Sequence, residues 1–368
     1  MGFSAVILAA GLSSRMGVPK PLLPVGQKPA LCVAAAAFAG VEDIIIVTGS
    51  FRREIEELVQ AEISFARTVH NARFNDGMFS SVLTGIGALP RECDGFFLLP
   101  ADTCLVSPDT ISLLFEKFTE TGGKTVLYPV SGGPRGHPPL IPGGFAEGIS
   151  DFSGEGGMKA YLEKFPSAEI ETGDAGILLD MDTPSDYAAL LKYAGLPAFP
   201  DGTARAALYE KYNVSASIIG HMALVAETAL EIAELINARG AKIDCGLLYS
   251  ACLVHDILRA EPEHALAGSR ALLRAGYPAA AALVQHHMEL PRECLGTISE
   301  TTILYLADKL CRDGKIVPLE ETSSELHTRF ADNPEARKGA ARKIEAAASV
   351  LAALTKKYGI TFEDISAV

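Results

Sequence analysis

Hydrophobic and polar positions alternate in two different rhythms along the chain, and the change comes near residue 194. Before that point, short apolar runs typical of buried strands alternate with Ala- and Leu-rich stretches of helical spacing. The predicted strands are Ala5–Ala9, Asp43–Thr48, Phe65–Val69, Gly95–Leu99, Thr125–Val130 and Gly176–Asp180. The predicted helices are Ala30–Ala39, Arg52–Val59, Met78–Ala88 and Pro108–Thr119. This alternation predicts an α/β fold: a Rossmann-like, mainly parallel sheet with helices on both faces.

After Tyr193 the pattern becomes helical. The segment 194–202 is rich in Pro and Gly and predicts a linker. Helical apolar spacing then covers Ser215–Arg239, Cys245–Leu258, His264–Ala275, Pro278–Met288, Ser299–Cys311 and Asn333–Tyr358, without a convincing strand. We therefore expect two domains, residues 1–196 and 203–368, and the second is expected to be all-α.

Composition narrows the class of protein. No run of about 18 apolar residues or signal-peptide pattern stands out, so neither a membrane span nor export is expected. Seven cysteines without a C-x-x-C pair favour reduced thiols in a cytoplasmic protein and make a poor zinc site. A net charge of −13 argues against binding of nucleic-acid polymer, but a small phosphorylated ligand could still occupy a local basic pocket.

The first predicted strand ends in a loop of small residues and two cations. It carries Gly11, Arg15, Gly17 and Lys20. Glycines let backbone N–H groups approach phosphate oxygens, and the cations neutralise the charge that gathers there. The loop matches neither G-x-x-x-x-G-K-[ST] nor G-x-G-x-x-G, which disfavours P-loop kinases and dinucleotide dehydrogenases. We predict a nucleoside triphosphate site; an ordinary glycine turn is the alternative.

Two carboxylate segments follow apolar stretches at the same predicted edge of the sheet. Asp102 comes after Gly95–Leu99, and Asp180 and Asp182 close the last predicted strand. Alternation would place Asp180 and Asp182 on one side of an extended segment. Carboxylates at that edge suit Mg²⁺, which takes oxygen ligands and bridges phosphates. The alternative role for either residue is a helix N-cap.

Two further segments have candidate ligand contacts. Ser80 and Ser81 lie near a predicted helix start, which suits an anion, although both could be plain caps. His137 lies in a loop rich in Gly and Pro, where a single histidine is often structural.

In the helical half, His221, His255, Asp256 and Asp308 lie in apolar stretches. Such groups are costly to bury unless they are paired or bind metal, and together they suit a divalent transition metal. His264, His286 and His287 are additional candidates. The two adjacent histidines point about 100° apart on a helix, so we expect one of them to reach the metal. The alternatives are a capping or surface His255–Asp256 pair and an exposed His264 at a helix start.

The stretch Val6–Lys20 closely resembles the signature of the molybdenum-cofactor nucleotidyltransferases, and Ala9-Ala10-Gly11 resembles its cytidylyltransferase branch. The resemblance implies transfer of CMP from CTP to the phosphate of a molybdopterin-type cofactor, with release of pyrophosphate. It also implies triphosphate contacts by Lys20 and Arg15 and Mg²⁺ at Asp102 and Asp182, with Asp180 as a further candidate. Nucleotide contacts fall on Ala9, Ala10, Gly11, Ser80 and Ser81, and a pterin contact falls on His137. Relatives usually carry Pro where this chain has Cys104.

The order His221, His255-Asp256, Asp308 resembles the HD-domain metal phosphohydrolases. The resemblance implies that these four residues bind a metal such as Mn²⁺ or Fe²⁺. In its two-metal subgroup Asp256 would bridge, and His264, His286 and His287 would bind the second ion. The phosphoester substrate is not identified, and some HD domains are nucleotide sensors.

The leading hypothesis is therefore a cytoplasmic cytidylyltransferase fused to an HD phosphohydrolase-type domain, with a molybdoenzyme or its chaperone as partner. A sugar-phosphate nucleotidyltransferase is one alternative. A non-catalytic cofactor-delivery protein with an HD sensor is the other.

Overall fold

The computed structural model describes residues 2–366. Contacts divide the chain between Leu196 and Pro197 into two compact units, which are described separately. The first unit mixes strands and helices, and the second is helical apart from one short hairpin.

The first unit is built on a seven-stranded sheet of order β5-β4-β1-β6-β8-β7-β9. Its strands are β1 (Phe3–Ala9), β4 (Asp43–Thr48), β5 (Ala66–His70), β6 (Gly95–Pro100), β7 (Val126–Val130), β8 (Leu140–Pro142) and β9 (Ser167–Glu171). β1 pairs in parallel with β4 and β6, β4 with β5, and β7 with β9, whereas β8 runs antiparallel to both its neighbours. The predicted mainly parallel sheet is confirmed.

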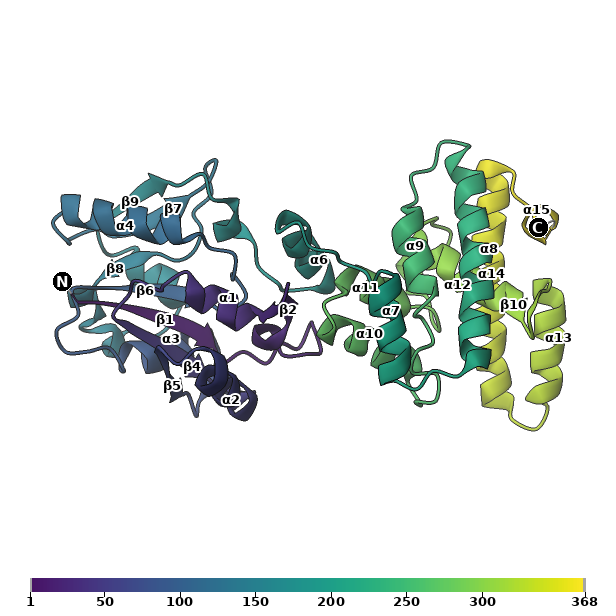
Figure 1. Ribbon diagram of the computed structural model, residues 1–368, viewed down its shortest axis with the longest axis horizontal. Coiled ribbons are helices and arrows are strands. Elements are labelled where there is room, and N and C mark those ends of the chain that lie inside the picture. The colour runs from purple at the N-terminus through teal and green to yellow at the C-terminus, as the bar shows by residue number, and fades with distance from the viewer. Residues whose placement is uncertain (1, 367–368) are drawn as a thin grey trace. The chain divides into compact units, whose positions relative to one another are not determined.

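Helices cover both faces of this sheet, because successive strand residues point to opposite sides. The helices of the unit are α1 (Ala30–Ala36), α2 (Arg52–Glu62), α3 (Met78–Ile86), α4 (Pro108–Glu120), α5 (Gly157–Leu162) and α6 (Pro184–Tyr193) (Figure 1). On one face, Phe96 joins a core cluster with α3 and α5. On the other, Phe97 packs against Phe38 and Phe115, with ring centroids 5.5 and 5.1 Å apart.

The main error of the sequence prediction lies at Gly176–Asp180. These residues do not form a strand, because Ala175–Leu178 is a 3₁₀ helix, η5, whose start is capped by the Asp174 carboxylate accepting from Gly176 N–H at 2.9 Å. The sheet instead gains β8 and β9, which were not predicted. Short connecting elements are β2 (Pro24–Val25), β3 (Lys28–Pro29), η1 (Lys20–Leu22), η2 (Phe74–Asp76), η3 (Gly143–Ala146) and η4 (Ile149–Asp151).

The second unit is a set of packed helices around α12. Its elements are α7 (Gly202–Lys211), α8 (Ala216–Asn237), α9 (Cys245–Cys252), α10 (His264–Arg274), α11 (Pro278–Val284), η6 (Arg292–Cys294), α12 (Glu300–Leu310), β10 (Cys311–Arg312), β11 (Lys315–Ile316), α13 (Leu319–Arg329), α14 (Pro334–Tyr358) and α15 (Phe362–Ser366). α12 contacts α8, α9, α11, α13 and α14, and most of its side chains are buried. The β10–β11 hairpin is a small exception to the all-α prediction.

Helix α8 illustrates how the sequence specifies this packing. Its buried residues Met222, Val225, Ala226, Ala229 and Ile232 recur at helical spacing, and the Ser215 hydroxyl caps its first turn. The helix is also long and apolar enough to cross a membrane by length and composition, a test that a core helix passes as well.

Candidate functional sites

A cleft of about 330 Å³ opens where β1 and β6 end. In sheets of this kind ligands bind at the carboxyl ends of the strands. The residues lining it include Ala9, Ala10, Gly11, Ser13, Arg15, Lys20, Met78, Ser81, Asp102 and Asp182. The structure thus brings the opening loop, the start of α3 and both carboxylate segments to one place.

The opening loop is held by its own hydrogen bonds and by close packing beneath it. The Ser13 carbonyl accepts from Gly17 N–H at 2.9 Å, and the Ser13 hydroxyl accepts from Lys20 N–H at 3.1 Å. Gly49 lies so close that a Cβ there would come within 2.5 Å of the Ala10 carbonyl oxygen. A Cβ on Gly11 would meet nothing within 4 Å, so the cleft side of the loop is open. Sequence reasoning missed the role of Ser13 in this loop.

Lys20 is the centre of a charged cluster in the cleft. Its Nζ donates to Asp102 Oδ2 at 2.9 Å and to Asp182 Oδ1 at 2.6 Å. Arg15, which is largely exposed, lies 2.8 Å from the other oxygen of Asp182. Burial disfavours the charged ammonium, but the hydrogen bonds and charges of both carboxylates raise the pKa of Lys20 overall. The hydrogen bond from Lys20 is the main cause that lowers the pKa of Asp182.

The two carboxylates fit a hard divalent cation. Oxygens of Asp102 and Asp182 already approach one positive nitrogen, which is the donor set that Mg²⁺ prefers. Burial and then the charges of Asp182 and Asp102 raise the pKa of Asp180, which does not line the cleft. The N-cap alternative fails for both carboxylates, because Ser107 caps α4 and Thr183 caps α6.

The two serines of α3 have different positions. Ser81 lines the cleft, whereas Ser80 is buried and its hydroxyl donates to the carbonyls of Arg73 and Gly77, both at 2.8 Å. Asn71 Nδ2 donates to both hydroxyls, at 2.8 and 3.0 Å. The predicted nucleotide contact by Ser80 is thus not supported by its position, because its hydroxyl is used to fix the segment that enters α3.

A second cleft of about 660 Å³ adjoins the first and shares Leu8, Met78 and Pro100 with it. His137 lies in this second cleft, and its backbone N–H donates to the Ile177 carbonyl at 3.0 Å. The ring is exposed to the cleft, yet the surrounding protein lowers its pKa by desolvation. Arg135 and Lys159 also line the cleft. Arg135 precedes His137 by two residues, a signal in the sequence that was missed, whereas nothing in the sequence marked Lys159.

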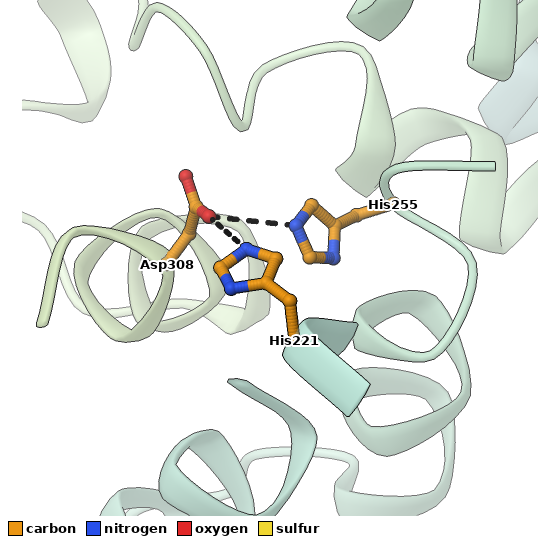
Figure 2. A group of neighbouring side chains, drawn as sticks. All are labelled: His221, His255 and Asp308. Carbon is orange, nitrogen blue, oxygen red and sulfur yellow. Dashed lines mark hydrogen bonds and ion pairs between the residues drawn. The ribbon is translucent and has the colours of Figure 1, made fainter. Parts of the chain in front are cut away.

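The helical unit brings the other predicted residues together. His221 on α8 lies 3.1 Å from Asp308 on α12, and His255, in the turn after α9, lies 3.4 Å from the same carboxylate (Figure 2). The ligand atoms of these three side chains all lie within 4.8 Å of one another. A second group with the same spacing consists of His255, Asp256 and His287.

His255 and His287 are oriented in the same way. Each donates its Nδ1 hydrogen to the backbone carbonyl three residues earlier, Cys252 or Val284, at 2.7 Å. This leaves Nε2 of each ring pointing into the cluster, the arrangement typical of metal-binding histidines. α9 ends at Cys252, so the predicted helix Cys245–Leu258 was too long.

Four buried polar atoms of the cluster have no hydrogen-bond partner in residues 2–366. They are Nε2 of His255, His264 and His287 and Oδ1 of Asp256. Leaving such atoms unpaired is costly, and a divalent cation would satisfy them, so these residues fit a metal. Asp256 faces two sides: Oδ2 lies 3.4 Å from His255, and Oδ1 lies 3.4 Å from His287 and 3.5 Å from His264.

His286 does not join the cluster. Its Nε2 lies 2.8 Å from the side-chain amide of Gln285. Adjacent residues in this turn point in different directions, and His287 is the one directed inward. His286 is therefore removed from the candidate metal ligands.

The charges inside the cluster are strongly coupled. Burial lowers the pKa of His255, but the Asp256 and Asp308 carboxylates outweigh it and raise that pKa to about 10. Burial raises the pKa of Asp256, yet its histidine neighbours bring it below the usual range. Burial lowers the pKa of His264 and His287, which favours neutral imidazoles.

Two domain families match the chain. Residues 5–170 match the MobA-like NTP transferase domain, and residues 218–313 match the HD domain. The chain is 30% identical over 184 residues to a molybdenum cofactor cytidylyltransferase of Escherichia coli, covering 50% of this chain and 92% of that protein. It is also 29% identical over 174 residues to a bifunctional protein GlmU of Carboxydothermus hydrogenoformans, which spans 46% of this chain and 37% of that one.

Solved structures also align with about half of the chain. A nucleotidyl transferase from Methanothermobacter aligns with 25% identity and a TM-score of 0.45, over 52% of this chain and 97% of its own. A molybdopterin-guanine dinucleotide biosynthesis protein A from Archaeoglobus fulgidus aligns with 14% identity and a TM-score of 0.42, over 52% and 98%.

The fold and the cleft at its strand ends define the first half as a nucleotidyltransferase domain. The chain belongs to the MobA-like NTP transferase family and carries an HD domain after it.

Proposed function

We propose that the first domain, residues 1–196, transfers CMP from CTP to the phosphate of a molybdopterin-type cofactor and releases pyrophosphate. The observation that carries the proposal is the pair of adjoining clefts, one lined by the Lys20 cluster and the other by His137. Two phosphate-bearing substrates need such neighbouring sites. The similarity to the E. coli cytidylyltransferase and the Ala9-Ala10-Gly11 sequence support CTP as the nucleotide.

In this proposal the protein acts by positioning and charge. Lys20 and Arg15 turn from their carboxylate partners to the triphosphate, which gathers negative charge as pyrophosphate leaves. Ala9, Ala10, Gly11 and Ser81 line the same cleft and would contact the nucleotide. Asp102 and Asp182 would hold Mg²⁺, which neutralises phosphate charge when bound. Cys104, the departure from the family pattern, is buried away from the cleft.

A pyrophosphate-release assay with the purified protein, a molybdopterin cofactor and each of the four nucleoside triphosphates tests this function. We expect release with CTP in excess over the other three. Release that requires a sugar phosphate instead would favour a sugar-phosphate nucleotidyltransferase. Tight cofactor retention without pyrophosphate release would favour a delivery protein.

We also propose that the second domain, residues 203–368, hydrolyses a phosphoester with a divalent transition metal. The four unpartnered polar atoms of the His–Asp cluster support this function. His221, His255, Asp256 and Asp308 would hold one ion, and His264 and His287 with Asp256 a second; such ions activate water for attack on phosphorus. Phosphate release from a panel of phosphoesters with Mn²⁺ is the test. Bound metal without turnover of any phosphoester would favour a nucleotide sensor.

This function agrees with a location in the cytoplasm. It also agrees with transfer of the product to a molybdoenzyme or its chaperone. Co-purification of the chain with a molybdoenzyme would test the second point.

A further inference from the structure

The pocket above the His–Asp cluster has a wall that lies outside the HD-family match. The match ends at residue 313, whereas α13 and α14 follow it. Together with His221, His264 and Asp308, residues of these helices line an open pocket of about 590 Å³. That volume is in the range of pockets for organic ligands and exceeds what a single phosphate needs.

Five cations line this pocket, and they fall into two groups. Three have carboxylate partners: Arg259 with Asp256, Lys309 with Asp308 at 2.5 Å, and Arg312 with Glu325 at 2.9 Å. The side chains of Arg329 and Lys343 have no hydrogen bond or ion pair within the described part of the chain. The two positive charges without a carboxylate partner thus come from α13 and α14; the Arg329 guanidinium also lies 5.8 Å from the centroid of the Phe330 ring.

Of the two, Lys343 gives the stronger indication of an anionic ligand. It is half-buried, and burial, followed by the charge of Lys309, lowers its pKa. An ammonium that is partly desolvated beside another cation is unfavourable unless an anion joins it. The charges of Glu289 and Asp308 offset part of this effect, but no carboxylate of the described residues lies in ion-pair range of Lys343, which leaves its ammonium available to a ligand anion.

The rest of the wall is apolar. Met288, Leu326, Phe330 and Ile344 line it. Gly339 lines it too, and a Cβ there would meet no protein atom within 4 Å, which leaves room beside α14. This surface suits a flat organic group rather than an inorganic anion.

We propose that α13 and α14 form a second substrate subsite, in which Arg329 and Lys343 bind an anionic group while the phosphoester lies at the His–Asp cluster. The substrate class is then an organic phosphoester with a flat apolar part and a second anionic group. This inference rests on the phosphohydrolase function proposed for the same domain.

Two probes that differ in one phosphate test the subsite: phenyl phosphate and 1,4-phenylene bisphosphate. Neither contains a nucleoside, so the transferase cleft is not addressed. With the full-length, Mn²⁺-loaded protein we expect KM for the bisphosphate to be at least about 10-fold lower, the effect of one charge-assisted hydrogen bond. Lys343→Met and Arg329→Met should each bring the ratio of the two KM values close to one.

Lys356→Met is the matched control, because Lys356 is exposed on the last turn of α14 and does not line the pocket. This variant should keep the wild-type ratio. Variants at Lys343 or Arg329 that change both KM values by the same factor would overturn the subsite.

Absence of turnover would contradict the phosphohydrolase function but still leave the subsite testable. Calorimetry of 1,4-phenylene bisphosphate with the Mn²⁺-loaded protein then decides. Binding that weakens about 10-fold in Lys343→Met supports the subsite. No binding, or equal affinity in wild type and Lys343→Met, overturns it.

Discussion

In the cleft of the first unit the charged groups are paired with one another, whereas four buried polar atoms in the cluster of the second unit have no hydrogen-bond partner among the described residues. Lys20 is bonded to Asp102 and Asp182, and Arg15 is paired with Asp182. Among the histidines, His255 and His287 are anchored through Nδ1, and each keeps a buried Nε2 without a hydrogen bond.

The two sites therefore differ in whether the protein itself supplies partners for their polar groups. In the transferase cleft an ammonium of the protein already lies between the two carboxylates, so they have a counter-charge before a ligand enters. In the HD cluster Arg259 pairs with Asp256 and Lys309 with Asp308, yet three ring nitrogens and one carboxylate oxygen still lack a hydrogen-bond partner among the described residues. We therefore expect the first site to depend on Lys20 for catalysis and the second to depend on metal for its integrity.

The largest expected effect comes from removing the cation of the first site. Lys20→Ala should reduce kcat for pyrophosphate release by about 100-fold or more, because the charge that faces the triphosphate is lost. It also leaves two carboxylates facing each other without a counter-charge. The measurement is pyrophosphate release with CTP and cofactor.

Lys28→Ala is the control for that experiment, since Lys28 is exposed on β3 and does not line the cleft. Metal-dependent phosphoester hydrolysis in the Lys20 variant reports on the integrity of the other domain. Turnover within 10-fold of wild type would contradict the assignment of Lys20.

The second prediction separates the two sites by metal removal. Mn²⁺ at 100 times its dissociation constant should stabilise the second unit by about 2.7 kcal/mol relative to the chelated protein. Amide hydrogen exchange is the measurement: protection should rise in α9 and α12 and change little in β1 and β6. Equal changes in amide protection in both units would contradict the claim that only the second site depends on metal.

The adjacent residues His286 and His287 test which ring of the pair binds metal. His287→Ala should weaken Mn²⁺ binding about 10- to 100-fold, because a buried nitrogen of the cluster is lost. His286→Ala is the matched control and should stay within about twofold, since its ring faces Gln285. Metal affinity by calorimetry decides between them. A larger loss in His286→Ala would mean that the cluster uses the other ring.

Much of the fold was predictable where one local pattern determines the element. The buried runs of β1, β4 and β6 and the helical spacing of α8 and α12 are of this kind. β9 was missed because its residues alternate between exposed and half-buried positions, and it exists through pairing with β7. The strand expected at Gly176–Asp180 was wrong because the Asp174 cap, a side-chain effect, starts a 3₁₀ turn there.

The candidate sites show the same division. The types of residue at Lys20, Asp102 and Asp182 could be chosen from the sequence, but their mutual ion pairs join positions up to 162 residues apart. Orientation was the harder part. That His287 rather than His286 enters the cluster depends on where α11 ends, and that Ser80 is tied to Gly77 depends on the entry into α3. No sequence motif includes Lys343. Its position beside the His–Asp cluster follows only from the packing of α14 against the pocket.

The smallest expected effect concerns the support of Asp182 in the first site. Thr183 begins α6 with a capping box: its hydroxyl accepts from Asp186 N–H at 3.2 Å, and the Asp186 carboxylate accepts from Thr183 N–H at 2.9 Å. Thr183→Ala should lower the free energy of unfolding of the first unit by about 1 kcal/mol, the usual value of a lost N-cap. Thr183→Ser keeps the hydroxyl and should retain most of that stability.

Because Asp182 stays bonded to Lys20 and Arg15, the Thr183→Ala variant should keep most of its transferase activity while α6 loses protection against amide exchange. Urea unfolding monitored by amide exchange in α6 measures the first quantity, and pyrophosphate release measures the second. A loss of activity as large as that of Lys20→Ala would show that the charged cluster depends on the cap. The ion pairs of the first site would then not be sufficient to maintain it, just as the second site is expected to need its metal.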